Sequence, residues 1–358
     1  MSILWDDNIL PMSQKKSQVT ERATLKSIAL KAKVDISTVS RVLSGNPDQR
    51  VSDKTKNKII KVARDIEYRP NISARSLRVS KTFSIGIVVP QLDNPVFSEI
   101  IKGAERGSIE HGYSLVISYL EDGSSPEEAY KKLTNSNRID GLLVTTLNEN
   151  SSILKAAKKS SVPVVVLNRR VPGLKNSIYF DSALAAKIAT NYLIKAGHKR
   201  IAHLSGQVNA STGVGRLAGY KDALEAAKIP FDSSLVEVSG YSIMGGLQAT
   251  DRLLENPKAR PTAIFALTLN VAVGAMMSLH KHGLQIPKDV SVISIHDAPI
   301  ADALYPPLTT VKMPSEEMGY QGAVGLISLI EKKREKVLIQ ISPGELIIRE
   351  SVSCFSKK

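Results

Sequence analysis

The sequence predicts an all-α helix-turn-helix head followed by a much larger α/β body. Three observations predict this division. Two short helical patterns separated by a tight polar break lie near the N-terminus, apolar runs alternate with helical patterns from Phe83 onward, and positive charge is concentrated in the first quarter of the chain. A chain of 358 residues with 42% hydrophobic residues is long enough for two or three domains.

The head is predicted to contain three short helices. Their apolar positions are Leu25, Ile28, Ala29 and Ala32 in the first, Val39, Val42 and Leu43 in the second, and Ile59, Val62, Ala63 and Ile66 in a third that runs from Asp53 to Ile66. A polar break at 33–36 separates the first two helices, and Ser44-Gly45-Asn46-Pro47 ends the second. This is the spacing of a helix-turn-helix, whose second helix can lie in the major groove of DNA.

The charge distribution also points to a nucleic-acid partner for the head. Residues 1–81 contain 17 Lys and Arg against 8 Asp and Glu, so most of the formal net charge of +14 lies there. A basic head on a nearly neutral body is typical of a protein that binds a polyanion, although a lysine-rich solvated face would give the same count.

The exposed face of the second helix contains the residues predicted to read bases. Asp35 is placed to cap this helix, and Ile36, Ser37 and Arg41 follow on its outer face. Arg can bind guanine with two hydrogen bonds, Ser can bond several bases, and Ile can pack on a thymine methyl group. The alternative is that Ile36 is buried and Arg41 pairs with an acid. The predicted phosphate contacts are Lys26, Thr38, Ser40, Lys54 and Arg69.

Several motifs give the chain a resemblance to a known family. They are TVSRVL, YRPN, ARSLR, DGLLV, GHKRIAHLSG, RLAGY and PPLTTV, and together they cover roughly residues 23–353. The sequence thereby resembles the lactose/purine repressor (LacI/GalR) family of transcriptional regulators. The resemblance implies a hinge helix in residues 71–80, between a head of residues 21–70 and a core of residues 81–358. Residues 1–20 are expected to be a disordered extension, and Met12 is an alternative start.

The hinge residues are carried over from the family motif Ala-Arg-x-Leu, which is Ala74-Arg75-Ser76-Leu77 in this chain. In the family, two hinge helices of a dimer enter the minor groove. By this resemblance Leu77 is the wedge between central base pairs, Ala74 lies at the hinge–hinge contact, and Arg75 and Arg78 lie near the DNA backbone. An apolar wedge costs a few kcal/mol of unstacking, which the contacts of a bent duplex offset.

The body is predicted to be built on parallel sheets. Its unbroken apolar runs are SIGIVVP, YSLVISYL, DGLLVTT, VPVVVL, SIYFD, RIAHLSG, LVEVSG, AIFAL and VSVISI, with helical patterns at 97–110, 126–133 and 183–196. Such runs between helices indicate strands buried on both faces, as in parallel α/β sheets, which bind ligands beyond the carboxyl ends of their strands. The resemblance adds a periplasmic-binding-protein-like core of two doubly wound lobes, 83–180 with 311–340 and 181–310 with 341–353.

The cleft between the lobes is where the resemblance implies a small-molecule effector, which would be a sugar, a sugar phosphate or a related metabolite. The residues carried over to it are Phe97, Asn168, Ser211, Thr212, Arg216, Tyr241, Thr268 and His296. Three carboxylates that are frequent in the family are absent, because His296, Thr268-Leu269 and Asn168 stand at those positions. We therefore hypothesise an anionic effector such as a sugar phosphate or an organic acid. The rival is a degenerate pocket in a regulator controlled by a protein corepressor.

A second motif competes with this interpretation. The residues from Gly213 to Ala218 fit the dinucleotide pattern G-x-G-x-x-A, with Glu237 at a suitable distance. A true fingerprint follows its strand immediately, whereas residues 207–212 intervene here and Glu237 lies in a strand pattern. The family resemblance instead makes this the segment that supplies Arg216.

Other classes of protein are disfavoured. No apolar run is long enough to span a bilayer, the N-terminus lacks a signal pattern, and the single cysteine, Cys354, fits a reducing cytoplasm. A sugar-binding transport component would not explain the head. Without a nucleophile elbow, a P-loop or a metal-spaced cluster, no catalytic residue, metal or cofactor is predicted. The expected protein is a homodimeric, cytoplasmic DNA-binding transcriptional regulator that recognises a pseudo-palindromic operator, and the resemblance implies a repressor.

Overall fold

A computed structural model describes most of the chain in two compact units, residues 1–78 and 79–358. The described residues are 23–43, 51–68, 81–90, 92, 94–119, 128, 131, 133–134, 138–145, 162–171, 173–207 and 210–355. The predicted N-terminal extension, the hinge and most of the predicted 126–133 helix lie outside these ranges.

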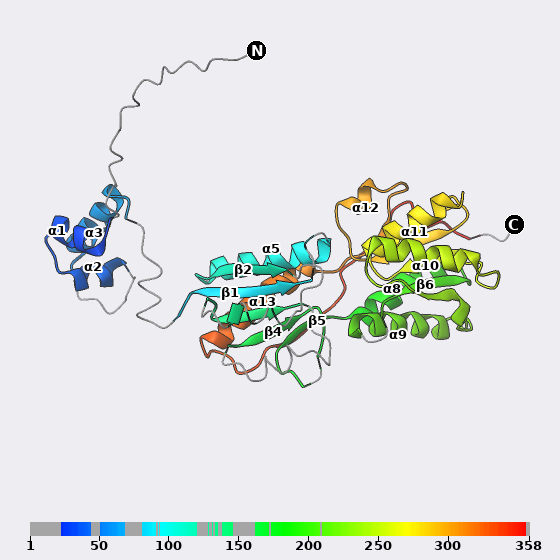
Figure 1. The fold of residues 1–358 in the computed structure, drawn as a ribbon, viewed down its shortest axis with the longest axis horizontal. Helices are drawn as coiled ribbons and strands as arrows, with labels where there is room; N and C mark the ends of the chain where they lie inside the picture. Colours follow the sequence, from blue (N-terminus) through cyan, green and yellow to red (C-terminus); the bar gives the residue numbers. More distant parts are fainter. Residues whose placement is uncertain are drawn as a thin grey trace, which may run out of the picture. The chain divides into compact units, whose positions relative to one another are not determined.

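The first unit contains the three predicted helices, α1 (Leu25–Ala32), α2 (Ile36–Leu43) and α3 (Asp53–Asp65) (Figure 1). Thr24 and Ser27 form a reciprocal capping box at the start of α1, and Ser52 caps α3. Lys33, at φ 55°, ends α1 in the left-handed conformation. The helix α2 then begins at Ile36, with the Asp35 carbonyl accepting from the Thr38 and Val39 amides.

The core of this unit is formed by the apolar faces of all three helices. The fully buried side chains are Ile28, Ala29, Ala32, Val39, Val42, Ile59 and Ala63, and Leu25, Leu43, Val62 and Ile66 pack around them. The predicted apolar positions are thus the ones that face this core, because the 3.6-residue period leaves each helix a single apolar face.

The second unit contains two lobes, each built on a sheet. Among the described residues, the first lobe has a six-stranded parallel sheet in the order β11-β5-β4-β3-β1-β2. Its strands are β1 (Ser84–Val89), β2 (Ser114–Tyr119), β3 (Gly141–Val144), β4 (Val164–Leu167), β5 (Ser177–Phe180) and β11 (Leu338–Ile341). The helices α5 (Pro95–Glu110) and α13 (Ser315–Ile330) pack together against it.

The second lobe repeats this plan with the order β12-β10-β9-β8-β6-β7 in its described part. Its strands are β6 (Ile201–Ser205), β7 (Val236–Val238), β8 (Ala263–Ala266), β9 (Ser291–Ile295), β10 (Thr309–Val311) and β12 (Leu346–Ile347), and only the β10–β12 pair is antiparallel. The helices α8 (Ser182–Lys195) and α9 (Ser211–Ala226) cover one face, and α10 (Ile243–Glu255) and α11 (Leu269–Lys281) cover the other (Figure 1). Short helical turns η1 (Ser233–Leu235) and α12 (Ile300–Ala303) complete the lobe.

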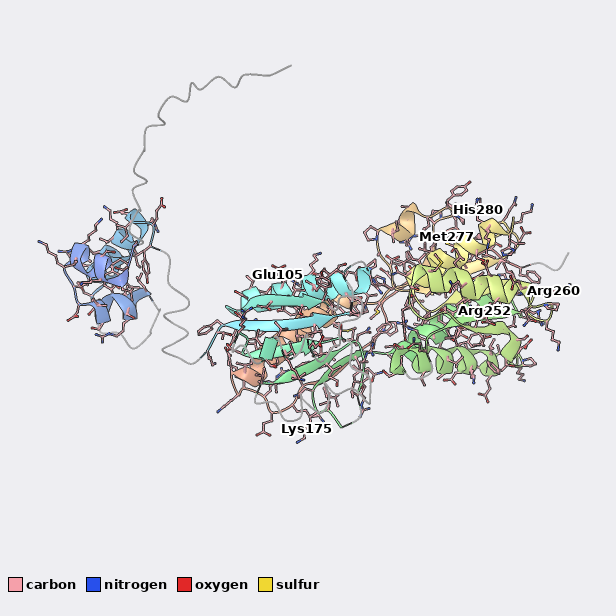
Figure 2. The ribbon with its side chains drawn as sticks, viewed as in Figure 1. Glu105, Lys175, Arg252, Arg260, Met277 and His280 are labelled. Carbon is pink, nitrogen blue, oxygen red and sulfur yellow. The ribbon has the colours of Figure 1, made fainter. Side chains whose placement is uncertain are left out.

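The burial of each strand depends on whether it lies inside its sheet or at the edge. The inner strands β3, β4, β8 and β9 are buried along their whole length, as their β-branched and apolar sequences predict. The edge strand β2 alternates and leaves Ile117 and Tyr119 exposed. On the helical layer of the second lobe, Arg252 of α10 and Met277 and His280 of α11 project outward (Figure 2).

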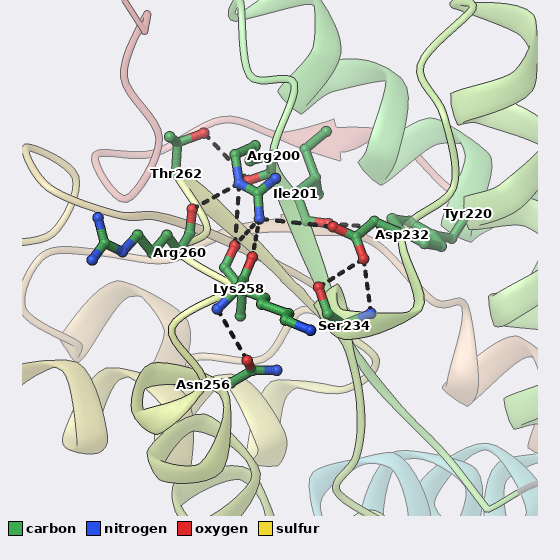
Figure 3. Close-up of polar contacts among 10 residues, drawn as sticks. Arg200, Ile201, Tyr220, Asp232, Ser234, Asn256, Lys258, Arg260 and Thr262 are labelled. Carbon is green, nitrogen blue, oxygen red and sulfur yellow. Dashed lines mark hydrogen bonds and ion pairs between the residues drawn. The ribbon is translucent and has the colours of Figure 1, made fainter.

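Arg200 fixes the edge of the second sheet that lies opposite the carboxyl ends of its strands. This residue immediately precedes β6, and its guanidinium donates to the carbonyls of Lys258, Ala259 and Arg260 (Figure 3). It also lies 3.7 Å from Asp232, and its own carbonyl accepts from Thr262. These contacts connect the loop before β8 to the start of β6.

The lobes are connected by three crossings of the chain that are hydrogen-bonded to one another. The crossing after β5 is joined to the one after β11, because the Asp181 amide donates to the Ile341 carbonyl over 3.0 Å. The crossing after β10 is also joined to the crossing after β11. The Lys312 amide donates to the Glu345 carbonyl, and the Lys312 carbonyl accepts from the Gly344 amide. No described helix of either unit is long and apolar enough to cross a membrane.

Candidate DNA-reading head and ligand cavity

The outer face of α2 carries the three predicted base-reading residues of the head. Ser37 and Arg41 are exposed and Ile36 is 44% exposed, while Val39 and Val42 on the opposite face are buried. The Arg41 Nε donates to the Ser37 carbonyl over 3.2 Å, which lays the side chain along the helix surface. An apolar, a hydroxyl and a guanidinium side chain therefore share one accessible helical face.

The described residues predicted to contact phosphates lie on all three helices of the head. Lys26 of α1 and Lys54 of α3 are exposed, and Thr38 and Ser40 of α2 are half-buried. Arg69 and the hinge residues Ala74, Arg75, Leu77 and Arg78 lie outside the described residues, so their predicted roles stay predictions.

A cavity of about 270 Å³ lies between the two lobes, beyond the carboxyl ends of the strands. Its described lining is Pro90, Asn94, Val96, Phe97, Asn168, Arg169, Gln207, Ala210, Thr212, Arg216, Tyr241, Thr268 and Met313. This is the edge at which doubly wound sheets bind ligands, because their connecting loops and helix N-termini gather there.

Six of the eight residues predicted for the cleft line this cavity, namely Phe97, Asn168, Thr212, Arg216, Tyr241 and Thr268. Ser211 begins α9 but is exposed and is not part of the lining. His296 is 1% exposed and also lies outside the lining, with its Nε2 3.2 Å from Oε2 of Glu99 in the first lobe. His296 thus contributes a contact between the lobes.

Arg216 is the most unusual residue of the lining. It is 3% exposed, and neither its Nε nor its Nη1 has a hydrogen-bond partner among the described residues. Burial lowers the pKa of its guanidinium to about 10, and the nearby Tyr241 partly offsets this effect. The side chain is therefore still a cation at neutral pH.

Other polar groups of the cavity are held by the fold. Asn168 follows β4 at φ 67°, and its buried Oδ1 has no partner among the described residues. The Thr212 hydroxyl and the Tyr241 hydroxyl are 2.9 Å apart, and Thr268 caps α11. The hydroxyls are thus oriented, whereas the amide oxygen of Asn168 is available to a ligand.

Sequence reasoning missed four polar or flexible residues of the lining, Asn94, Arg169, Gln207 and Met313. Arg169 and Gln207 follow the carboxyl ends of β4 and β6 within two residues, so their places after buried strands were the available signal. Burial lowers the pKa of Arg169.

The dinucleotide-like pattern has a structural explanation. Gly213, Gly215 and Arg216 lie inside α9, and a Cβ on Gly213 would be 3.0 Å from the Gln207 carbonyl oxygen. Glu237 of β7 pairs with Arg252, with Oε2 3.1 Å from Nε. Gly213 and Gly215 therefore allow close packing around α9. Glu237 is paired with Arg252. Among the described residues, no three His, Cys, Asp or Glu side chains are grouped to hold a metal ion.

Comparison with known proteins accounts for both units. Residues 24–71 match the family described as bacterial regulatory proteins, lacI family. Residues 82–350 match the family described as periplasmic binding proteins and sugar binding domain of LacI family. The second match alone covers well over half of the chain.

Individual relatives are similar over nearly their whole length. The ribose operon repressor of Haemophilus influenzae is 32% identical over 92% of this chain and 98% of its own. The transcriptional repressor CytR of Escherichia coli is 33% identical over 95% of this chain and 98% of its own. A crystal structure of the lac repressor dimer bound to operator and the anti-inducer ONPF is 27% identical and superposes with a TM-score of 0.80 over 93% of this chain and 100% of that one. These relatives are transcription regulators, and the chain belongs to the LacI family of bacterial regulatory proteins.

Proposed function

We propose that this protein represses transcription by binding a pseudo-palindromic operator as a homodimer, under the control of a small molecule in the cavity between its lobes. The observation that carries the proposal is the accessible face of α2, on which Ile36, Ser37 and Arg41 stand opposite the buried Val39 and Val42. A helix of this kind, held by a second helix across a short turn, fits the major groove.

The side chains of the head suit both parts of DNA recognition. Arg41 can donate two hydrogen bonds to guanine, and Ile36 can pack on a thymine methyl group. The exposed Lys26 and Lys54 supply phosphate contacts, which fix position without reading sequence. By resemblance to the family, Leu77 of the hinge would add a wedge in the minor groove.

Dimerisation is supported by the size of the head and by apolar surface on the core. One head reads too few base pairs for specificity, so two heads related by a twofold axis are needed. Exposed apolar side chains occur on α10, α11 and α12, namely Ile243, Met244, Met277 and Ile300, and Tyr305 beyond α12 is 96% exposed. The lac repressor structure noted above is itself a dimer on its operator.

Control by an effector follows from a cavity that both lobes line. A ligand that prefers one angle between the lobes shifts the population toward that arrangement. In a dimer this would stabilise or melt the hinge and change operator affinity. Such a regulator acts where the chromosome is, so we assign it to the cytoplasm, with no catalytic role.

The proposal is tested by capturing sheared genomic DNA on the purified protein and sequencing what is retained. A pseudo-palindrome upstream of transport or catabolic genes is the expected result. Retention that depends on salt but shows no motif would contradict the proposal, because it would leave only nonspecific attraction between the basic head and phosphates.

Two matched substitutions separate base reading from phosphate contact. Arg41→Ala is expected to weaken operator binding by about 1–3 kcal/mol while leaving nonspecific binding nearly unchanged. Lys54→Ala is expected to weaken operator binding and nonspecific binding alike. It should also reduce the slope of log affinity against log salt concentration by about 1. Leu77→Ala should behave like Arg41→Ala, and an equal loss of specific and nonspecific binding would argue against the wedge.

A further inference from the structure

We propose that the effector is a small metabolite with a phosphate or carboxylate group, and that Arg216 and the N-terminus of α9 hold this group. The inference deepens the proposed function, because it names the chemical class of the ligand in the cavity. It rests on three features of the described residues: an unpartnered buried cation, an uncapped helix N-terminus and a lining without acids.

The first feature is the guanidinium of Arg216. It lines the cavity, is 3% exposed and has two N–H groups, at Nε and Nη1, without partners among the described residues. Buried charges in proteins are normally paired, because an isolated one loses its hydration without compensation. A ligand oxyanion is the partner that a guanidinium binds best, since two parallel hydrogen bonds can form.

The second feature is the start of α9, the helix that carries Arg216. Its N-cap residue is Ala210, whose methyl group cannot accept a hydrogen bond, and no side chain caps the helix. By contrast, α5 and α11 are capped by Asn94 and Thr268. The Ala210 amide donates to the Gln207 carbonyl over 3.1 Å, so the amides that have no intrahelical acceptor are those of Ser211, Thr212 and Gly213 in the first turn. These amides and the positive end of the helix dipole lie at the side of the cavity that Ala210 and Thr212 line.

The third feature is the charge of the lining. The described lining contains two arginines, Arg169 and Arg216, and no Asp or Glu. The nearby Glu99 bonds to His296 at 3.2 Å, and neither residue is part of the lining. Such a site favours an anion, whereas a neutral sugar is usually held by carboxylates that accept from its hydroxyl groups.

The remaining lining suits the uncharged part of a small ligand. Phe97 and Tyr241 provide aromatic surface, and the unpartnered Oδ1 of Asn168 can accept from a hydroxyl group. The cavity volume of about 270 Å³ is just below the usual range of ligand pockets, about 300–1,000 Å³. The proposed ligand is thus of the size of a single sugar phosphate or a small organic acid.

Isothermal titration calorimetry on the full-length protein tests this inference with matched probes. The pairs are ribose and ribose 5-phosphate, a hexose and its 6-phosphate, and a nucleoside and its 5′-monophosphate, with citrate and inorganic phosphate tested alone. At least one anion is expected to bind ten-fold or more tightly than its neutral counterpart. Arg216→Gln is expected to abolish that preference, and Arg216→Lys to retain part of it.

Arg252→Gln is the control, because Arg252 is an exposed arginine of the same lobe (Figure 2). Arg252 pairs with Glu237 and is not part of the lining. It should leave every affinity unchanged. A neutral sugar that binds more tightly than its phosphate, an equal effect of Arg216→Gln on both members of a pair, or no binding by any anion would overturn the inference. Operator retention by the same preparation shows in each case whether the proposed function itself stands.

Discussion

The substitution Arg216→Met should make the ligand-free protein more stable, although it removes a side chain from the centre of the molecule. Arg216 is 3% exposed and two of its N–H groups have no partner among the described residues. The charge is therefore buried with only the partial compensation that the nearby Tyr241 provides, and a methionine of similar length would fill much of the same space.

The magnitude follows from the effect of burial on the guanidinium. A pKa lowered to about 10 corresponds to about 3 kcal/mol of destabilisation of the charged form. Because the folded protein binds this proton less tightly than the unfolded chain does, the destabilisation is complete below about pH 10 and decreases above it. After the loss of some packing, we expect a net gain of about 1–2 kcal/mol, or about 2–6 °C in the melting temperature of the core.

Differential scanning calorimetry of the full-length protein at pH 7, in a buffer without phosphate, measures this effect. Arg252→Met serves as the matched control, because its exposed ion pair with Glu237 contributes at most about 1 kcal/mol. Arg216→Met should also lose the stabilisation that an anionic ligand gives the wild-type protein. A melting temperature that falls by several degrees would refute the reasoning, because it would mean that Arg216 is paired in the ligand-free protein.

Three further predictions concern other parts of the second unit. Gly103→Ala should destabilise it by about 1–3 kcal/mol in chemical denaturation, because the new Cβ would overlap the Glu316 carbonyl where α5 and α13 meet. Asp251→Asn should cost about 1–2 kcal/mol at pH 7, since hydrogen bonds from Ser278 and Lys281 lower the pKa of Asp251 to about 2. That difference should shrink as the pH falls from about 4 to about 2 and the wild-type carboxylate protonates. Met277→Lys should shift the dimer toward monomers in sedimentation, and an unchanged dimer would place the interface elsewhere.

The amino-acid sequence was sufficient to predict the helices and strands whose apolar residues recur in a regular pattern. In the head, the positions Ile28, Val39 and Ile59 predict the buried faces because each short helix has one apolar side. In the core, runs such as those of β3 and β4 predict buried parallel strands because they contain no polar side chain. These signals are local, so they can be read without knowing the partners of each element.

The helix α9 is an element whose glycines could not be interpreted from the local sequence. Its residues include Gly213 and Gly215, which belong to the dinucleotide-like pattern, and also Gly219. A Cβ on Gly219 would meet the Ala183 carbonyl, so this glycine is set by the close approach of α8. A requirement that comes from a neighbouring helix cannot be read from the sequence of α9 itself.

The cavity was predictable in position but not in all its members. Phe97, Asn168 and Arg216 follow from the family resemblance, and strand ends predict the edge at which they gather. His296 departs from the expectation because its backbone lies at φ 79° and its ring bonds to Glu99 of the other lobe. The direction of a side chain at such a turn depends on tertiary contacts, which the sequence does not contain.

The contact between Glu99 and His296 also connects recognition to movement. It joins the two lobes beside the cavity, while Met313, in the crossing after β10, lines the cavity directly. That crossing is bonded through Lys312 to the crossing after β11, and Asp181 bonds the crossing after β5 to it as well. A ligand that contacts Met313 therefore acts on three connected segments at once. Under the proposed function, such an arrangement would let a small molecule change the angle between the lobes without breaking either core, because the crossings would bend while each sheet moved as a unit.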